Sequence, residues 1–319
     1  MRFVRWAVLF FFLLHEGLWA QSPVRTIMTN RGKIFDFEVD EPNDALFLAH
    51  EYEAVSVMGL KSGAPRDLYL GFGGSVRCIG LSQRKDVLFA GGGDSAVFTF
   101  SLPELKRISR RNGHKNWVYD LVVDPRQDVV YSTGPDTLIL LWDLLSSKPI
   151  DTLKGHKHWI WKLKFGPDPN QLYSSAGESE LVRWNLEKGK IDVRFHGHLA
   201  AIFDIDVHPD GQMLASCSWD GTVRIWNVQT GNEIQLLTPR QLMQSVCWSP
   251  DGKFLILGDY SGNLYLYQVQ GWKKIHQFQA HGGAIRKISF LKGSDGKYQV
   301  LTAGDDSRLK FWDFSAWLP

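Results

Sequence analysis

The feature that most constrains this chain is a unit of about 42 residues that occurs seven times in succession. An apolar, mostly β-branched residue opens a strand-like segment at a nearly constant interval, at Ile34, Val76, Val118, Ile160, Ile202, Met243 and Ile285. The spacings are 42, 42, 42, 42, 41 and 42 residues, and the seven units fill the chain after its N-terminal segment. Such periodicity is typical of folds that repeat one small supersecondary unit.

Each unit has room for four short strands. In the fifth unit, strand-like segments at 202–207, 213–218, 222–228 and 233–237 are separated by turn sequences rich in Gly, Asp and Asn. Apolar runs such as Leu138–Leu141 indicate strands buried on both faces. Four strands per 42 residues are typical of a propeller blade. The sequence therefore predicts an all-β, seven-bladed β-propeller of four-stranded antiparallel blades.

The last unit is one strand short. After Trp312 and Asp313 only six residues remain, too few for a turn and a fourth strand, whereas residues 24–29 are strand-like and precede the first unit. We expect this N-terminal strand to complete the last blade and close the ring over residues 21–319, because closure removes open sheet edges.

Two dipeptides recur in phase with the units. Gly-His pairs occur at Gly113-His114, Gly155-His156 and Gly197-His198, with Ala280-His281 as a variant; Trp-Asp or Trp-Asn pairs occur at Trp142, Trp184, Trp226 and Trp312. On these motifs the chain resembles the WD-repeat β-propeller family over residues 23–319.

The resemblance implies that a His, a Ser or Thr, a carboxylate and a Trp form a hydrogen-bonded tetrad within a blade. Four units carry such a set: His114, Ser132, Asp136 and Trp142; His156, Ser174, Glu178 and Trp184; His198, Ser216, Asp220 and Trp226; and His281, Thr302, Asp306 and Trp312. Ser, His and Asp together also suggest a hydrolase. Because the set is repeated fourfold, we interpret it as structural, since a buried carboxylate needs donors.

The resemblance also implies exposed rim positions, three and five residues after the His and one before the turn carboxylate. These positions carry Phe35, Trp117, Tyr119, Trp159, Trp161, Phe203, Trp219, Leu242 and Tyr260, which we call the aromatic rim; units two and seven are polar there, with Arg77, Arg286 and Asp305. Contiguous exposed aromatics mark recognition surfaces. The alternative is that the rings pack against neighbouring loops.

The N-terminus is typical of an export signal. A basic start, an apolar run over residues 6–14 and a small residue, Ala20, predict a signal peptide over residues 1–20, and hence a periplasmic or extracellular protein. The apolar run is short for a membrane-spanning helix. An uncleaved anchor is the alternative.

The remaining composition excludes several functions. A net charge of +2 with no run of five like charges argues against nucleic-acid binding and a stable membrane anchor. Three Cys without a C-x-x-C pair make neither a zinc site nor a disulfide framework. One repeat position of the innermost strands carries charges of both signs and is occupied by Asp36, Cys78, Asp120, Lys162, Asp204, Ser245 and Lys287. We expect this position to hold no metal ion and the protein to need no cofactor.

These observations predict a non-enzymatic exported scaffold, monomeric or part of a hetero-complex, that holds a protein or peptide partner on the aromatic rim. The alternatives are a periplasmic propeller enzyme, lactonase-like or quinone-dependent dehydrogenase-like, and a carbohydrate-binding propeller. Such enzymes need clustered carboxylates and His, but the His residues outside the tetrads are scattered along the sequence.

Overall fold

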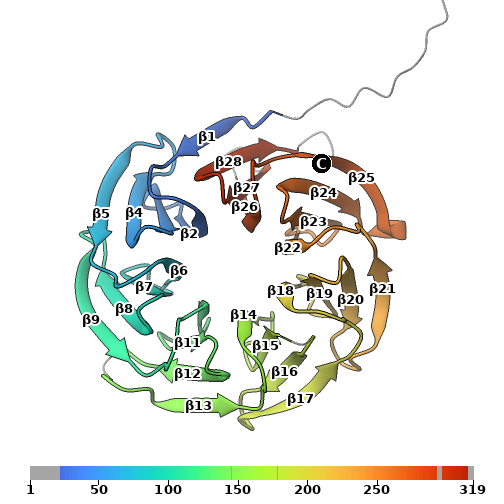
Figure 1. Ribbon diagram of the computed structural model, residues 1–319, viewed down its shortest axis with the longest axis horizontal. Coiled ribbons are helices and arrows are strands. Elements are labelled where there is room, and N and C mark those ends of the chain that lie inside the picture. Colours follow the sequence, from blue (N-terminus) through green and yellow to red (C-terminus); the bar gives the residue numbers. More distant parts are fainter. Residues whose placement is uncertain (1–21, 145, 178, 293–296, 315–319) are drawn as a thin grey trace, which may run out of the picture.

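The computed structural model describes residues 22–144, 146–177, 179–292 and 297–314, which form seven four-stranded antiparallel sheets. The sheets stand around a common axis like the blades of a propeller, with the last blade beside the first (Figure 1). The predicted fold class is therefore confirmed. The signal peptide predicted for residues 1–20 lies outside the described residues. Within the described ranges, no helix combines the length and apolar character needed to span a bilayer.

In blades one to six, the strands follow one another from the axis to the circumference in chain order. Blade one comprises β2 (Ile34–Asp40), β3 (Ala45–His50), β4 (Ala54–Gly59) and β5 (Pro65–Leu70). Blade two comprises β6 (Val76–Leu81), β7 (Val87–Gly92), β8 (Ala96–Ser101) and β9 (Lys106–Asn112). Blade three comprises β10 (Asp120–Val123), β11 (Val130–Thr133), β12 (Leu138–Trp142) and β13 (Asp151–Lys154).

The second half of the ring repeats this order. Blade four comprises β14 (Ile160–Phe165), β15 (Gln171–Ala176), β16 (Leu181–Asn185) and β17 (Lys190–Phe195). Blade five comprises β18 (Ile202–Val207), β19 (Met213–Ser218), β20 (Val223–Asn227) and β21 (Glu233–Leu237). Blade six comprises β22 (Met243–Trp248), β23 (Phe254–Asp259), β24 (Asn263–Gln268) and β25 (Lys273–Gln279), with a 3₁₀ turn, η1 (Gln270–Trp272). Blade seven comprises β26 (Ile285–Lys292), β27 (Tyr298–Gly304), β28 (Arg308–Asp313) and β1 (Arg25–Met28).

The N-terminal strand closes the ring as expected. β1 pairs antiparallel with β28, from Arg25 opposite Phe311 to Met28 opposite Arg308. Ile27 is buried and packs in a cluster that joins β28 to Leu60 of blade one. The first and last blades are thus held together by a strand from one end of the chain and a strand from the other.

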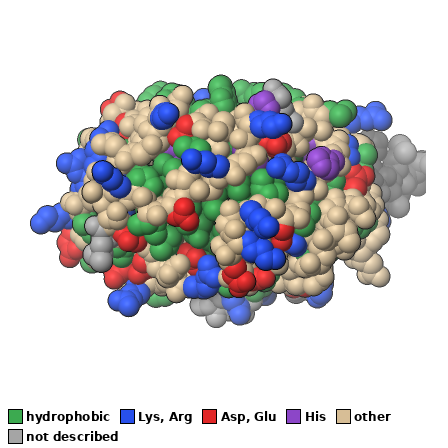
Figure 2. Space-filling model, turned by 90° about the horizontal axis from the view of Figure 1, so that it is seen from below, with side chains coloured by type: hydrophobic (Ala, Val, Ile, Leu, Met, Phe, Trp, Pro, Cys, Tyr) green, Lys and Arg blue, Asp and Glu red, His purple; other side chains and the backbone are tan. Residues whose placement is uncertain are grey.

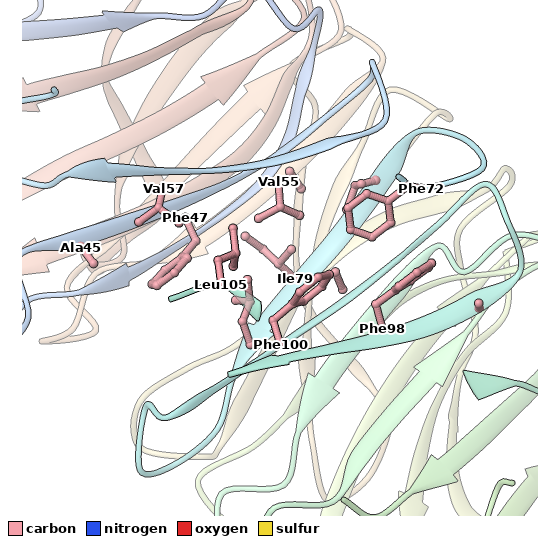
Figure 3. Close-up of a cluster of buried hydrophobic side chains, with 14 residues drawn as sticks. Ala45, Phe47, Val55, Val57, Phe72, Ile79, Phe98, Phe100 and Leu105 are labelled. Carbon is pink, nitrogen blue, oxygen red and sulfur yellow. The ribbon is translucent and has the colours of Figure 1, made fainter. Parts of the chain in front are cut away.

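The hydrophobic core lies between neighbouring blades, as the cluster between blades one and two illustrates (Figure 3). Blade two has Phe72 and Phe100 where blade three has the tetrad His and Trp. The Phe72 ring packs edge-on against Phe98, with centroids 4.6 Å apart, and Tyr69 packs in the same way against Phe100. Aromatic packing replaces the tetrad in this blade.

A β-bulge recurs near the start of the innermost strands. In six blades the register shifts after the first strand residue, for example between Ile34 and Asp36 and between Ile202 and Asp204. The bulged residues are Phe35, Arg77, Trp161, Phe203, Gln244 and Arg286. Bulges re-aim side chains, and here bulged residues and their successors, such as Phe35 and Asp36, line the same cavity.

Candidate functional site

The four tetrads are assembled by facing strands and turns of one blade. In blade three, His114 Nδ1 lies 2.8 Å from Asp136 Oδ2 and its Nε2 lies 2.7 Å from Ser132 Oγ, which also accepts the Trp142 indole N–H at 2.7 Å. Blades five and seven reproduce these contacts to within 0.1 Å. The Ser or Thr hydroxyl accepts from Trp and still has its own hydrogen to donate to His Nε2, an arrangement in which His Nδ1–H donates to the carboxylate.

Blade four brings into its tetrad a carboxylate that the sequence spacing did not indicate. His156 Nδ1 lies 3.0 Å from Glu180 Oε2, whereas the sequence spacing had indicated Glu178, which lies outside the described residues. Glu180 directly precedes β16, and its side chain, longer than the Asp of the other tetrads, reaches the imidazole from that position. The hydrogen bond with His156 lowers the pKa of Glu180 to about 2.

The glycine of the Gly-His pair has a packing reason. A Cβ at Gly113 would lie 2.6 Å from the Trp142 ring, and one at Gly197 would lie 3.0 Å from the Trp226 ring. The tetrad Trp therefore packs directly on the backbone where the chain enters the blade. The tetrad hydroxyls of these blades are fully buried, which leaves no accessible nucleophile among them.

We expect Asp220→Ala to destabilise the protein by about 1–3 kcal/mol, because it leaves His198 and the Leu199 N–H without their acceptor. Burial alone would raise the pKa of Asp220, but hydrogen bonds from His198 and Thr222 outweigh it and hold the pKa well below its ordinary value. The ionised form is therefore the stabilising one, and the deficit of the variant should shrink as the pH falls below about 4. Urea unfolding at two pH values measures both effects; equal stability of variant and wild type at neutral pH would refute the assignment.

The aromatic rim forms a continuous run of rings across blades three to six. Tyr119 stacks on Trp161 with centroids 4.5 Å apart and planes 4° apart. Trp161 lies 4.8 Å from Phe203, and Phe203 stacks on Trp219 at 4.4 Å. Tyr260 meets Trp219 edge-on at 6.2 Å. The structure thus brings five rim rings from four blades into one array.

The other rim residues flank this array. Trp117 lies 6.3 Å from Tyr119, and Trp159 lies 6.0 Å from Trp161. Trp159 is 53% exposed, and Trp117, Trp219, Leu242 and Tyr260 are exposed as well. Phe35, Tyr119, Trp161 and Phe203 are half-buried towards the axis. The rings pack on one another and still present an exposed surface, and its use in recognition stays a prediction.

The half-buried rim residues surround the channel mouth, a cavity of about 100 Å³ on the axis, together with Arg77, Gln244 and Arg286. Charged residues form the floor of the channel mouth. Asp36 contacts Lys287 at 2.6 Å, and Asp120 contacts Lys162 at 3.1 Å.

The floor carboxylates also join neighbouring blades. Asp36 accepts the Ile79 N–H of the next blade at 2.9 Å, and Asp204 accepts the Val246 N–H at the same distance. Burial raises the pKa of Asp204 to about 6. Among the described residues, no three His, Cys, Asp or Glu side chains gather so as to hold a metal ion.

The circumference differs from the rim. Figure 2 shows one side of the disc, where charged side chains of both signs are scattered among apolar ones. Exposed apolar residues on the outer strands, such as Leu70, Ile108 and Ile234, belong to separate blades. Among the described residues, the exposed aromatic rings that contact one another lie on the rim.

Family models match most of the ring. The WD domain, G-beta repeat model matches residues 105–143, 147–185, 189–227 and 272–313, and the model of the anaphase-promoting complex subunit 4 WD40 domain matches residues 237–292. Together they cover more than half of the sequence, on a seven-bladed propeller. The chain belongs to the WD-repeat β-propeller family.

The four matched WD repeats are the ones that contain the tetrads of blades three, four, five and seven. Blade one and most of blade two are matched by neither model. The tetrad residues are the most specific part of the repeat, and blade two has replaced them with Phe72, Ala90 and Phe100.

Several curated proteins are similar to this WD-repeat chain over short stretches. UBP9-binding protein bun62 of Schizosaccharomyces pombe is 32% identical over 72 residues, which are 22% of this chain and 13% of that protein. Pre-mRNA-processing factor 19 of the same yeast is 26% identical over 82 residues, 26% of this chain and 16% of that protein. Human mitogen-activated protein kinase-binding protein 1 is 30% identical over 81 residues, 25% of this chain and 5% of that protein. The matches thus span less than a fifth of each of these proteins.

Sequence reasoning missed two kinds of site residue. Leu199, directly after the tetrad His198, is 87% exposed, and its N–H bonds Asp220 next to Trp219. The sequence could have indicated Leu199, because this apolar residue stands where blades three and four have lysine. Arg77 was set aside as polar, yet it lies in contact with the rings. The sequence could have indicated Arg77, because it occupies the same repeat position as Phe35.

Proposed function

We propose that this protein is a non-catalytic, exported scaffold that holds a protein or peptide partner on the aromatic rim. The observation that carries the proposal is the unbroken array of rings from Tyr119 to Tyr260, with exposed Trp117 and Trp159 beside it. The relatives named as binding proteins support the same class of function. Export rests on the sequence of residues 1–20.

The array has the physical properties of a binding hot spot. Trp and Tyr bury a large area when a partner covers them, and they dominate the energy of many interfaces. Stacking fixes the rotamers of Trp161 and Phe203 before binding, so less side-chain entropy is lost on association. The bulges place these rings on the rigid innermost strands. A partner would therefore meet a preformed surface.

We expect Trp161→Ala/Trp219→Ala to abolish capture of the partner from the exported fraction of the source cells, while the fold is retained. The bait is the affinity-tagged full chain, and mass spectrometry compares the captured proteins. The matched control is Ile108→Ala/Ile234→Ala, which removes two exposed apolar side chains from the circumference and should leave capture unchanged. Circular dichroism checks that all three proteins are folded.

Three outcomes would contradict the proposal. The first is capture of the same proteins by the rim variant and the wild type. The second is binding to a glycan array that depends on the same two Trp, with no protein partner captured. Recovery of the protein only in the unexported fraction would refute export.

A further inference from the structure

The channel mouth contains a guanidinium without a carboxylate partner. Arg77 lies 4.8 Å from the centroids of both Phe35 and Trp117 and 5.5 Å from that of Tyr119. Within the described ranges it has no ion pair, and its Nε is buried without a hydrogen-bond partner. Burial lowers the pKa of Arg77, which reflects the poor solvation of this cation.

Arg286, on the other side of Phe35, shows what Arg77 lacks. It lies 5.7 Å from the same ring, but its Nε and Nη2 form two bonds of 2.7 Å to the Asp305 carboxylate. A planar fork bound by a carboxylate is the preferred geometry of an arginine in a poorly hydrated site. Arg77 has the aromatic packing of such a site without its anion.

Other unpaired groups line the same cavity. The Trp161 indole N–H is buried without an acceptor, and the Gln244 side chain, 7% exposed, has a buried carbonyl oxygen without a donor. The floor carboxylates Asp36 and Asp120 are already occupied by lysines and backbone N–H groups. Among the described residues that line the mouth, Arg77 is thus the cation that lacks an anion, and a carboxylate would supply one.

The size of the cavity at the mouth suits a single side chain. About 100 Å³ is well below the roughly 300–1,000 Å³ of pockets that bind drug-sized ligands. The rest of the partner would contact the aromatic rim around the cavity, where exposed Trp159 and Trp219 flank the mouth over blades four and five.

The charges of the surrounding rim also favour an acidic partner. Lys115 and Lys157 follow tetrad histidines, Arg240 borders Trp219 and Leu242, and all three are exposed with no ion pair in the described part of the chain. The tetrad carboxylates beside these cations are bound by histidines, and Asp305 is bound by Arg286; Glu53, in the hairpin of blade one, is exposed. The rim therefore presents unpaired positive charge among its rings.

We propose that a partner protein docks on the aromatic rim by inserting one Asp or Glu side chain into the channel mouth, where the carboxylate pairs with Arg77. This inference rests on the proposed function, and it adds the chemistry of the residue recognised. The exposed basic residues of the rim, Lys115, Lys157 and Arg240, attract the acidic segment.

Selection from a displayed library of random peptides on the immobilised full-length protein tests the inference. We expect peptides with an Asp or Glu among apolar residues to be enriched on wild type and lost on Arg77→Gln. Arg107→Gln is the matched control, since it removes an exposed, unpaired charge from the outer strand of the same blade. It should leave the selection unchanged.

The best peptide is then synthesised with its acid or with the amide analogue. We expect the amide to bind at least about tenfold more weakly in calorimetry, as for the loss of a charged hydrogen bond, and Arg77→Gln to cause a similar loss that does not add to the first. Arg77→Lys should retain part of the affinity, which shows that the site is intact.

The failures of the two proposals differ. Peptides that need Trp161 and Trp219 but bind Arg77→Gln as tightly as wild type, or that are neutral or basic, would overturn the carboxylate inference alone. If no peptide depends on the two Trp, the proposed binding surface fails and the inference fails with it.

Discussion

A chain in which residues 22–32 are deleted should lose most of its stability. The deletion removes β1, which leaves the edge of β28 open and takes buried Ile27 out of the cluster between blades seven and one. Loss of the Ile27 side chain alone is worth about 2–5 kcal/mol, a large part of the roughly 5–15 kcal/mol that stabilises a typical domain. We expect a melting temperature lower by more than about 10 °C, or aggregation through the open edge, measured by calorimetry and size-exclusion chromatography.

Point variants separate the effect of the buried β1 side chain from the effect of shortening the chain. Ile27→Ala should destabilise by about 2–5 kcal/mol, whereas Met28→Ala, at a neighbouring position that is 67% exposed, should change stability by less than about 0.5 kcal/mol. A deletion product as stable and soluble as the full chain would show that β1 does not hold the ring closed.

Trp226→Ala should destabilise the protein by about 3–5 kcal/mol. The indole is fully buried, packs on Gly197 and donates to Ser216 Oγ at 2.8 Å, so its removal leaves a cavity inside blade five. Trp226→Phe should recover part of the loss, because it fills most of the space but cannot donate. Equilibrium unfolding in urea measures both variants.

A rim tryptophan provides the comparison. Trp159→Ala removes the same type of side chain from an exposed position and should change stability by less than about 1 kcal/mol. If Trp159→Ala and Trp226→Ala were equally destabilising, the division of the tryptophans into structural and binding residues would be wrong.

Most of the architecture could be predicted from the repeat. Six of the seven landmark residues begin an innermost strand, and the exception, Val118, lies two residues before β10 and is still fully buried. A fixed period preserves which residues point into the core, because every unit must bury the same positions against its neighbours. The closing strand could also be predicted, since the last unit lacked a strand that the N-terminus supplied.

The carboxylate that contacts His156 stands at a position that the sequence spacing did not indicate. Spacing places the carboxylate 22 residues after the His in blades three and five, but Glu180 stands 24 residues after His156 and has an additional methylene. In blade five the corresponding position holds Thr222, which also lies near His198, so two backbone positions have access to the imidazole. The spacing in the other blades therefore did not indicate Glu180.

The sequence by itself determined the number of blades, the ring closure and the residues of three tetrads, because these follow from local patterns repeated at one period. Only the tertiary structure decided which rim side chains contact one another. The stack from Tyr119 to Trp219 and the unpaired state of Arg77 join residues from different blades. The distances between these side chains depend on the β-bulges and on the curvature of the ring. Neither can be calculated from the spacing of residues in the sequence.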